Sequence, residues 1–370
     1  MWRPVPPAAV IACLRGRFAV LLITSCALAL ALTGGLILAS SPTASAKGAA
    51  LLTSSQAEPV AGGDQCEAPN WRAIAAQREA QRRFLVNNGG FGVAGSAGVT
   101  LAFMPGPVRT PRPLLLEDLQ RQQGFATGLL SATIGRYSPA QMMLDISQGT
   151  RVASGLYRPS APPVPAMALG QFGAGRIVGW EGYRARAADA PGELLPGLMA
   201  ESVIGRGGSV SYVGTAGGSN TAAMAAAAGQ CGILQSVSLG PQATLTARAE
   251  AAQGSSALTV VALPPGGYGV GALESLARTA PKRMIIVVQA PPDPARNRLL
   301  PLAVRGLGGD GGLKSPTTRR TGLVTGTDIA PTVLKQLGIV PPREMDGRPI
   351  EAASAMDAEQ LEAMSDRLSL

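Results

Sequence analysis

The side chains that could carry hydrolytic chemistry in this chain are carboxylates and hydroxyls, because its 370 residues include no histidine. Without histidine the chain lacks the usual general base and the commonest zinc ligand. A cation site would have to use oxygen ligands, which Mg²⁺, Mn²⁺ and Ca²⁺ prefer. The aspartates that would have to converge to form one are Asp145, Asp293, Asp310 and Asp328.

Asp328 stands where a short apolar strand, Leu323-Val324, gives way to a helical pattern. An aspartate at a helix N-cap accepts hydrogen bonds from the free amides of the first turn. Pro331 fits that first turn, where a missing N–H costs nothing, and Gly338 is a natural C-cap. The apolar stripe of the helix consists of Ile329, Val333, Leu334 and Leu337. We therefore expect Asp328 to cap this helix, which commits its carboxylate to a structural role.

The segment GLVTGTDIAPTVLKQLGI (322–339), followed by MDGRPI (345–350), resembles the C-terminal strand–helix–loop of the alkaline-phosphatase-like superfamily. That superfamily includes sulfatases and cofactor-independent phosphoglycerate mutases. An ordinary strand–helix unit with a good cap explains the pattern less completely. More narrowly, the chain is similar to a group of actinobacterial envelope proteins of unknown function, in which such a domain precedes several membrane helices.

The resemblance implies that the metal ligands of the catalytic families are missing here. Their first strand ends in an aspartate, where this chain has Met104-Pro105-Gly106. A later strand is followed by an Asp-His pair, where this chain has Asp293 without a histidine. A last metal histidine would fall near Lys314–Thr318, which contains none. We therefore expect no metal ligands and no cofactor, and interpret Asp293 as a surface turn residue.

The resemblance also places a Ser or Thr nucleophile near residues 138–154, at a helix N-terminus. The hydroxyls there are Ser138, Ser147 and Thr150, and none has a basic partner nearby in the sequence. An unassisted hydroxyl is a poor nucleophile. We therefore expect no catalytic residue among them.

Alternating strand and helix patterns predict an α/β fold, with a mostly parallel sheet and helices on both faces, over residues 67–350. Residues 155–192 are rich in Pro, Gly and Ala and predict a long loop with a strand at Arg176–Trp180. A C-terminal helix or tail covers 351–370. The expected strands are Gly98–Met104, Ser209–Gly214, Cys231–Leu239, Ala257–Leu263, Arg283–Pro292 and Leu300–Arg305. The expected helices include Leu114–Gln123, Leu194–Ile204, Asn220–Ala228, Gln242–Gln253 and Gly271–Ala280.

The first 46 residues predict a targeting segment. Arginines in residues 1–17 precede an uncharged run from Phe18 to Ala46, long enough to cross a bilayer as a helix. Ala44-Ser45-Ala46 also offers a site that signal peptidase could cut. Both a cleaved signal and an uncleaved membrane anchor remain open, and either exports the remainder.

Export changes the interpretation of the cysteines. Cys13 and Cys26 belong to the targeting segment, which leaves Cys66, at the end of a linker over 47–66, and Cys231. An even pair in an oxidising compartment favours a disulfide, and two free buried thiols are the alternative.

Three functional hypotheses follow. The first is an exported, membrane-tethered, non-catalytic alkaline-phosphatase-like domain that acts in binding or envelope assembly. The second is a hydrolase of phosphate or sulfate esters with a histidine-free carboxylate site. The third is the extracytoplasmic part of a split multi-pass membrane protein. The net charge of +9 comes from scattered arginines without an aromatic-interleaved stripe, so we expect no nucleic-acid partner.

Overall fold

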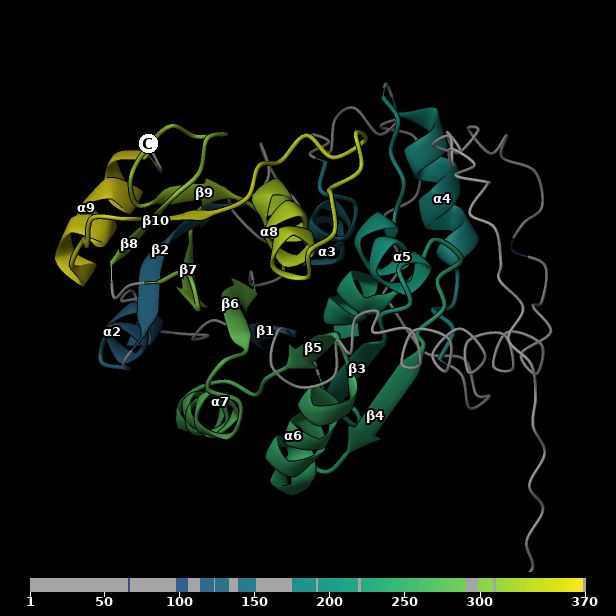
Figure 1. Ribbon diagram of the computed structural model, residues 1–370, viewed down its shortest axis with the longest axis horizontal. Coiled ribbons are helices and arrows are strands. Elements are labelled where there is room, and N and C mark those ends of the chain that lie inside the picture. The colour runs from purple at the N-terminus through teal and green to yellow at the C-terminus, as the bar shows by residue number, and fades with distance from the viewer. Residues whose placement is uncertain are drawn as a thin grey trace, which may run out of the picture. The chain divides into compact units, whose positions relative to one another are not determined.

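The structure is a computed structural model, shown in Figure 1. It describes residue 66 and residues 98–105, 114–122, 124–132, 139–150, 175–190, 192–218, 221–290, 299–308 and 311–368. These residues belong to one compact unit, Gly62–Leu370. The predicted targeting segment and linker lie outside the described residues, apart from Cys66. Within the described ranges, no helix has the length and apolar character needed to cross a membrane.

The described strands form one ten-stranded sheet, in the order β10-β8-β2-β7-β6-β1-β5-β3-β4, with β9 paired to β2. The five strands from β4 to β6 in this order are parallel, and β7 runs antiparallel to both β6 and β2. The predicted α/β class with a mostly parallel sheet is therefore confirmed. The strand bounds are β1 (Val99–Pro105), β2 (Phe125–Ser131), β3 (Val210–Thr215), β4 (Ser236–Gly240), β5 (Leu258–Ala262), β6 (Met284–Ala290), β7 (Leu300–Arg305), β8 (Gly312–Lys314), β9 (Leu323–Thr325) and β10 (Glu351–Ala353).

Helices cover both faces of the sheet, as Figure 1 shows. Alternate residues of β1 and β6 point into two apolar clusters, because successive side chains of a strand face opposite sides. One cluster includes buried residues of α2 (Leu114–Gln120), α6 (Leu245–Ser255) and α7 (Gly267–Thr279). The other includes buried residues of α3 (Pro139–Gln148), α4 (Trp180–Asp189), α5 (Leu198–Gly205), α8 (Ile329–Gln336) and the 3₁₀-helix η1 (Thr221–Ala227). The arrangement is a three-layer sandwich, which buries the central strands on both sides.

The C-terminal segment packs against the sheet. β10 pairs with β8, and α9 (Ala358–Leu368) places Leu361 and Met364 against Leu129 of β2. The predicted C-terminal helix is therefore present, and its buried side belongs to the domain core.

Three local predictions were wrong. The predicted strand at Arg176–Trp180 is a single bridge between Arg176 and Ile233, because the chain turns at Gly179, which has a left-handed φ of 75°, and continues as α4. The predicted helix at 220–228 is the 3₁₀-helix η1, and the predicted strand at Cys231–Leu239 shortens to β4. Gly232 has a φ of 70°, a turn conformation that interrupts an extended strand.

Candidate functional site

The carboxyl ends of the parallel strands lie at one edge of the sheet, where α/β proteins commonly bind ligands. At the end of β1, Met104 is 2% exposed and packs in the apolar cluster with α7. A Cβ placed on Gly269 of α7 would come within 3.0 Å of Met104 Cε, so the methionine side chain fills this space. Apolar packing therefore occupies the end of β1 at this edge of the sheet.

Several predicted positions cannot be placed against this edge. Gly106, Ser138, Asp293 and Asp310 lie outside the described residues. Among the residues that the structure does describe, no three His, Cys, Asp or Glu side chains gather closely enough to hold a metal ion.

Asp328 lies beside the end of β9 and is fully buried. Its Oδ1 accepts hydrogen bonds from Thr317 Oγ1 at 2.6 Å and from the Arg348 backbone N–H at 2.9 Å. Its Oδ2 accepts from the Thr325 backbone N–H at 2.8 Å. One carboxylate thus ties together the loop before β9, the entry to α8 and the loop that follows α8.

The expected N-cap role of Asp328 was wrong in its detail. Asp328 is the last residue of a 3₁₀ turn, η3 (Gly326–Asp328), through which the chain enters α8. Its carboxylate forms a capping box with Thr325, reaching back along the chain, and makes no side-chain hydrogen bond to the first turn of α8. Asp328 does occupy the N-cap position of α8, as expected, but the 3₁₀ turn before it directs its carboxylate back to Thr325, which explains the difference.

The two halves of the recognised motif are held together by close backbone packing. A Cβ on Gly347 would lie 2.0 Å from the Thr327 carbonyl oxygen, so only glycine allows this approach. Thr332 Oγ1 donates to the Asp328 carbonyl at 2.6 Å and accepts from the Ile350 N–H at 2.8 Å. These contacts hold α8 and the MDGRPI loop (345–350) in a fixed relative position.

The described hydroxyls in the predicted nucleophile segment are engaged with backbone groups. Ser147 is fully buried, donates to the Leu144 carbonyl at 2.8 Å and accepts from the Gly197 N–H at 3.2 Å. Thr150 Oγ1 donates to the Glu344 carbonyl at 2.6 Å. Neither hydroxyl donates to a base that could activate it.

Asp145 belongs to the same helix, α3, and is 1% exposed. Its Oδ1 accepts from Gln141 Nε2 at 2.8 Å and from Gln148 Nε2 at 3.4 Å. These glutamines lie four residues before and three residues after it, so all three side chains share one side of α3. Asp145 therefore has local amide partners inside the core.

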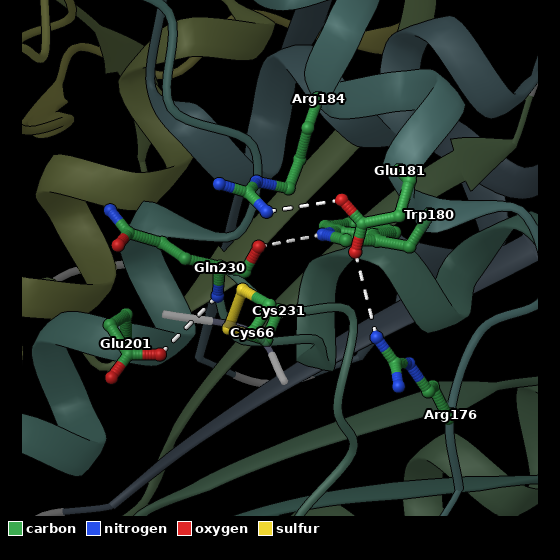
Figure 2. Close-up of a disulfide and its surroundings, with 8 residues drawn as sticks. All are labelled: Cys66, Arg176, Trp180, Glu181, Arg184, Glu201, Gln230 and Cys231. Atoms are coloured by element: carbon green, nitrogen blue, oxygen red, sulfur yellow. Dashed lines mark hydrogen bonds and ion pairs between the residues drawn. A yellow bond between two sulfur atoms is a disulfide. The ribbon is translucent and has the colours of Figure 1, made fainter. Parts of the chain in front are cut away.

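Cys66 and Cys231 form the expected disulfide, with their Cα atoms 5.4 Å apart (Figure 2). Their separation of 165 residues makes the bond a long-range connection between the region before the sheet and the loop before β4. Both cysteines are half-buried.

Trp180 anchors the loop that carries Cys231. Its Nε1–H donates to the Gln230 carbonyl at 2.8 Å, and the Gln230 N–H donates to Glu201 Oε2 at 3.3 Å (Figure 2). The tryptophan is 1% exposed, and a Cβ on Gly232 would lie 2.3 Å from its Cγ. The disulfide therefore joins a loop whose position is fixed by a buried aromatic ring.

Exposed ion pairs surround this anchor. Glu181 pairs with Arg184 at 3.1 Å and with Arg176 at 3.5 Å, and all three side chains are at least 39% exposed (Figure 2). Pairs at this exposure contribute little stability. The buried contacts of Trp180 and the covalent bond carry the local structure.

A buried cation at the opposite edge of the sheet was missed by the sequence analysis. Arg283 precedes β6 and is 1% exposed, and burial lowers its pKa to about 10, which leaves it charged at neutral pH. Among the described residues no carboxylate pairs with it; its donors bind neutral oxygens instead. These acceptors are Val99 O, Gln253 O, Ser256 O, Ala257 O, Thr100 Oγ1 and Thr259 Oγ1.

Gly98 makes room for this guanidinium. A Cβ on Gly98 would lie 2.0 Å from Arg283 Nη1, so a side chain at this position would displace the guanidinium. Because Arg283 binds backbone carbonyls beside β1 and β5, it fastens the amino ends of the central strands. The only sequence signal was an arginine at the head of a continuous apolar strand.

No protein-family model matches the chain, and no curated protein matches it. The functional argument therefore rests on the fold and on the contacts described above.

Proposed function

We propose that this chain is an exported, membrane-tethered, non-catalytic member of the alkaline-phosphatase-like superfamily that acts in binding or envelope assembly. The observation that carries the proposal is the commitment of Asp328. Its carboxylate, at the motif that gives the resemblance, is fully buried and bound to three donors of the protein itself. Two of these bonds end on Oδ1 and one on Oδ2, so three of the roughly four acceptor sites of the carboxylate are used by the protein itself.

Two further features support the same proposal. Met104 replaces a carboxylate with buried apolar packing at the end of β1. Ser147 and Thr150 donate their hydroxyl protons to main-chain carbonyls, so neither is prepared for attack on a phosphate or sulfate ester.

Export is supported by the disulfide. Bonds such as Cys66–Cys231 persist in oxidising compartments and are rare in the cytosol of most organisms. The predicted segment 1–46 would deliver the domain there, either as a cleaved signal or as a membrane anchor.

A hydrolase assay tests the non-catalytic proposal. The purified full chain is incubated with generic aryl phosphate and aryl sulfate esters in the presence of Mg²⁺, Mn²⁺ or Ca²⁺. We expect no turnover above that of the metal alone. Metal-dependent turnover that Asp293→Ala abolishes, while the exposed Asp366→Ala on α9 leaves it intact, would refute the proposal and favour the carboxylate-site hydrolase.

Partner capture tests the assembly role. Extraction of membranes in mild detergent, followed by purification of the full chain, should recover a multi-span membrane protein as a stoichiometric partner. Recovery of the chain alone, from membranes in which it is correctly exported, would contradict a role in assembly.

A further inference from the structure

The two edges of the sheet are built differently. β10 forms one edge with three residues, and its Glu351 pairs with Lys314 of β8. β4 forms the other edge beside α6, as Figure 1 shows, and no described strand pairs with its outer side. Proteins commonly protect such an edge with charged side chains or a bulge, because its free main-chain groups can pair with another chain. β4 has no charged side chain.

The groups that face outward from β4 follow from its pairing with β3. The Ala216 N–H donates to the Gly240 carbonyl at 3.0 Å, so the main-chain groups of Gly240 point towards β3. These groups alternate in direction along a strand, so those of Ser238 also point towards β3, whereas those of Val237 and Leu239 point away from it. Val237 and Leu239 therefore offer N–H donors and carbonyl acceptors that no described strand uses.

The side chains of these two residues give the edge an accessible apolar surface. Leu239 is 46% exposed, and Val237 is half-buried and packs against the apolar cluster that includes α5. Both side chains lie on the same face of the sheet, since the residues are two positions apart. A strand added alongside β4 would cover Leu239 and would also pair the outward main-chain groups.

The stretch around β4 carries no charge, although the chain as a whole has a net charge of +9. No charged residue occurs from Cys231 to Ala247. Arg248, which follows this stretch, uses its guanidinium for the carbonyls of Gly214, Ser238 and Pro241. An acidic partner would therefore find no free cation along this strand, whereas a second copy of this basic chain would meet no like charge there.

The order of residue types in β4 is symmetric about Ser238. In an antiparallel pair of two copies with a two-fold axis at Ser238, Val237 lies opposite the partner's Leu239, and Ser236 lies opposite the partner's Gly240. Each Val237–Leu239 pair then exchanges both of its N–H···O bonds, as an antiparallel ladder requires. The two copies of Ser238 form the non-hydrogen-bonded pair on the axis.

The neighbouring helix leaves room for a second copy. α6 lies beside β4, since its Arg248 donates to the Ser238 carbonyl at 2.6 Å. The exposed side of α6 includes Ala247 and Ala251. Small side chains at these positions allow another helix to approach closely, so α6 does not obstruct the pairing of β4.

We propose that β4 is a dimer interface, at which two copies of this chain join their sheets by antiparallel pairing centred on Ser238. The proposal goes beyond the non-catalytic role and does not depend on it, because ester turnover at the carboxyl edge of the sheet would leave the outer side of β4 unchanged. Pairing over five residues is small beside the roughly 800 Å² that each partner buries in a stable complex. We therefore expect a weak dimer, with a Kd on the order of 10 μM.

Cysteine crosslinking tests both the partner and the register. The full chain, purified in detergent, carries Cys13→Ser and Cys26→Ser, so that the introduced cysteine is the only one besides the Cys66–Cys231 pair. The Cα atoms of a non-hydrogen-bonded pair are about 4.5 Å apart, within the roughly 4.4–6.8 Å that a disulfide spans. Mild oxidation of Ser238→Cys should therefore give a covalent dimer on a non-reducing gel.

Ser236→Cys is the matched control. It lies on the same face of β4 and is more exposed, but the two copies of residue 236 would be roughly 14 Å apart along the paired strands. We expect no covalent dimer above background from this variant. No crosslink in Ser238→Cys at about ten times the expected Kd, or equal crosslinking at both positions, overturns the proposal.

Sedimentation velocity of the full chain over a concentration series measures the association itself. Leu239→Lys places a charge opposite the partner's Val237 and should weaken the dimer at least about tenfold. The Tm of this variant in dilute solution should stay that of the wild type, because Leu239 is exposed. Val340→Lys adds the same charge at another exposed apolar position, in the loop after α8, and should associate as the wild type does. Unchanged association of Leu239→Lys overturns the proposal.

Hydrogen exchange distinguishes a second copy from another segment of the same chain as the occupant of this edge. The Val237 and Leu239 amides should exchange freely at low concentration and become protected as the dimer forms. A wild type that stays monomeric at every concentration overturns the proposal. Protection of both amides in that monomer would assign the edge to another segment of this chain.

Discussion

Replacing Asp328 with alanine should destabilise the domain by about 3–5 kcal/mol, with or without divalent metal. The change removes the acceptor of two backbone N–H groups, those of Thr325 and Arg348, and of the Thr317 hydroxyl. Each buried N–H that loses its partner costs about 1–3 kcal/mol, and the hydroxyl can turn towards another acceptor. The expected loss is a large share of the roughly 5–15 kcal/mol that holds a typical domain folded.

Asp328→Asn should lose less, about 2 kcal/mol, because its carbonyl oxygen still accepts while its NH₂ group opposes a donor. The order of stability is therefore wild type, then asparagine, then alanine. Asp366→Ala, an exposed aspartate on α9, serves as the matched control and should stay within about 0.5 kcal/mol of the wild type.

Urea unfolding of the purified, disulfide-intact chain, followed by circular dichroism, measures these differences. Each variant is unfolded in EDTA and again in Mn²⁺. A structural Asp328 predicts the same loss in both buffers. The contrary result is that Mn²⁺ stabilises the wild type but not Asp328→Ala, so that the two differ in stability only in Mn²⁺. That result would show that the carboxylate is a metal ligand and refute the reasoning.

Three further outcomes follow from the packing. Arg283→Met should destabilise the domain by about 3–5 kcal/mol in urea unfolding, because it leaves buried carbonyls and hydroxyls unpaired at the amino ends of the central strands. A loss below about 1 kcal/mol would contradict the role of Arg283 in holding these strand ends together. Gly347→Ala should lower the Tm as severely as Asp328→Ala does, because its Cβ would meet the Thr327 carbonyl at 2.0 Å. Gly271→Ala in α7, with open space around it, should be neutral or stabilising by up to about 1 kcal/mol. Equal Tm values for the two glycine variants would contradict the close approach. Cys66→Ser with Cys231→Ser should lower stability by about 2–4 kcal/mol, and mass spectrometry of the unreduced wild type should find both thiols blocked to alkylation; two free thiols would exclude the bond.

The central strands could be predicted because their apolar runs are continuous. Leu258–Ala262 and Met284–Ala290 are covered by helices on both faces, so nearly all of their positions are apolar. The exceptions are Thr259, which binds Arg283, and Gln289. α4 was missed because only three of its ten residues are buried. Its buried positions, Trp180, Tyr183 and Ala187, follow helical spacing at i, i+3 and i+7, a weak signal in a segment rich in glycine and alanine.

The residue types at the site do not predict its hydrogen-bond partners or the burial of its charged side chains. The position of Asp328 before a helix was visible, but its partner, the Arg348 N–H, is a main-chain group 20 residues away. The burial of Arg283 could not be predicted, because an arginine at a strand end is ordinarily exposed. The partners that decide the role of both residues come from tertiary packing.

The most direct test of the central claim is anomalous diffraction from crystals of the full chain soaked in Mn²⁺. We expect no anomalous peak within ligand distance of Asp328, and no peak shared by several carboxylates at the carboxyl ends of the parallel strands. A peak bound by Asp328 together with Asp293 or Asp310 would contradict the account and establish a carboxylate metal site.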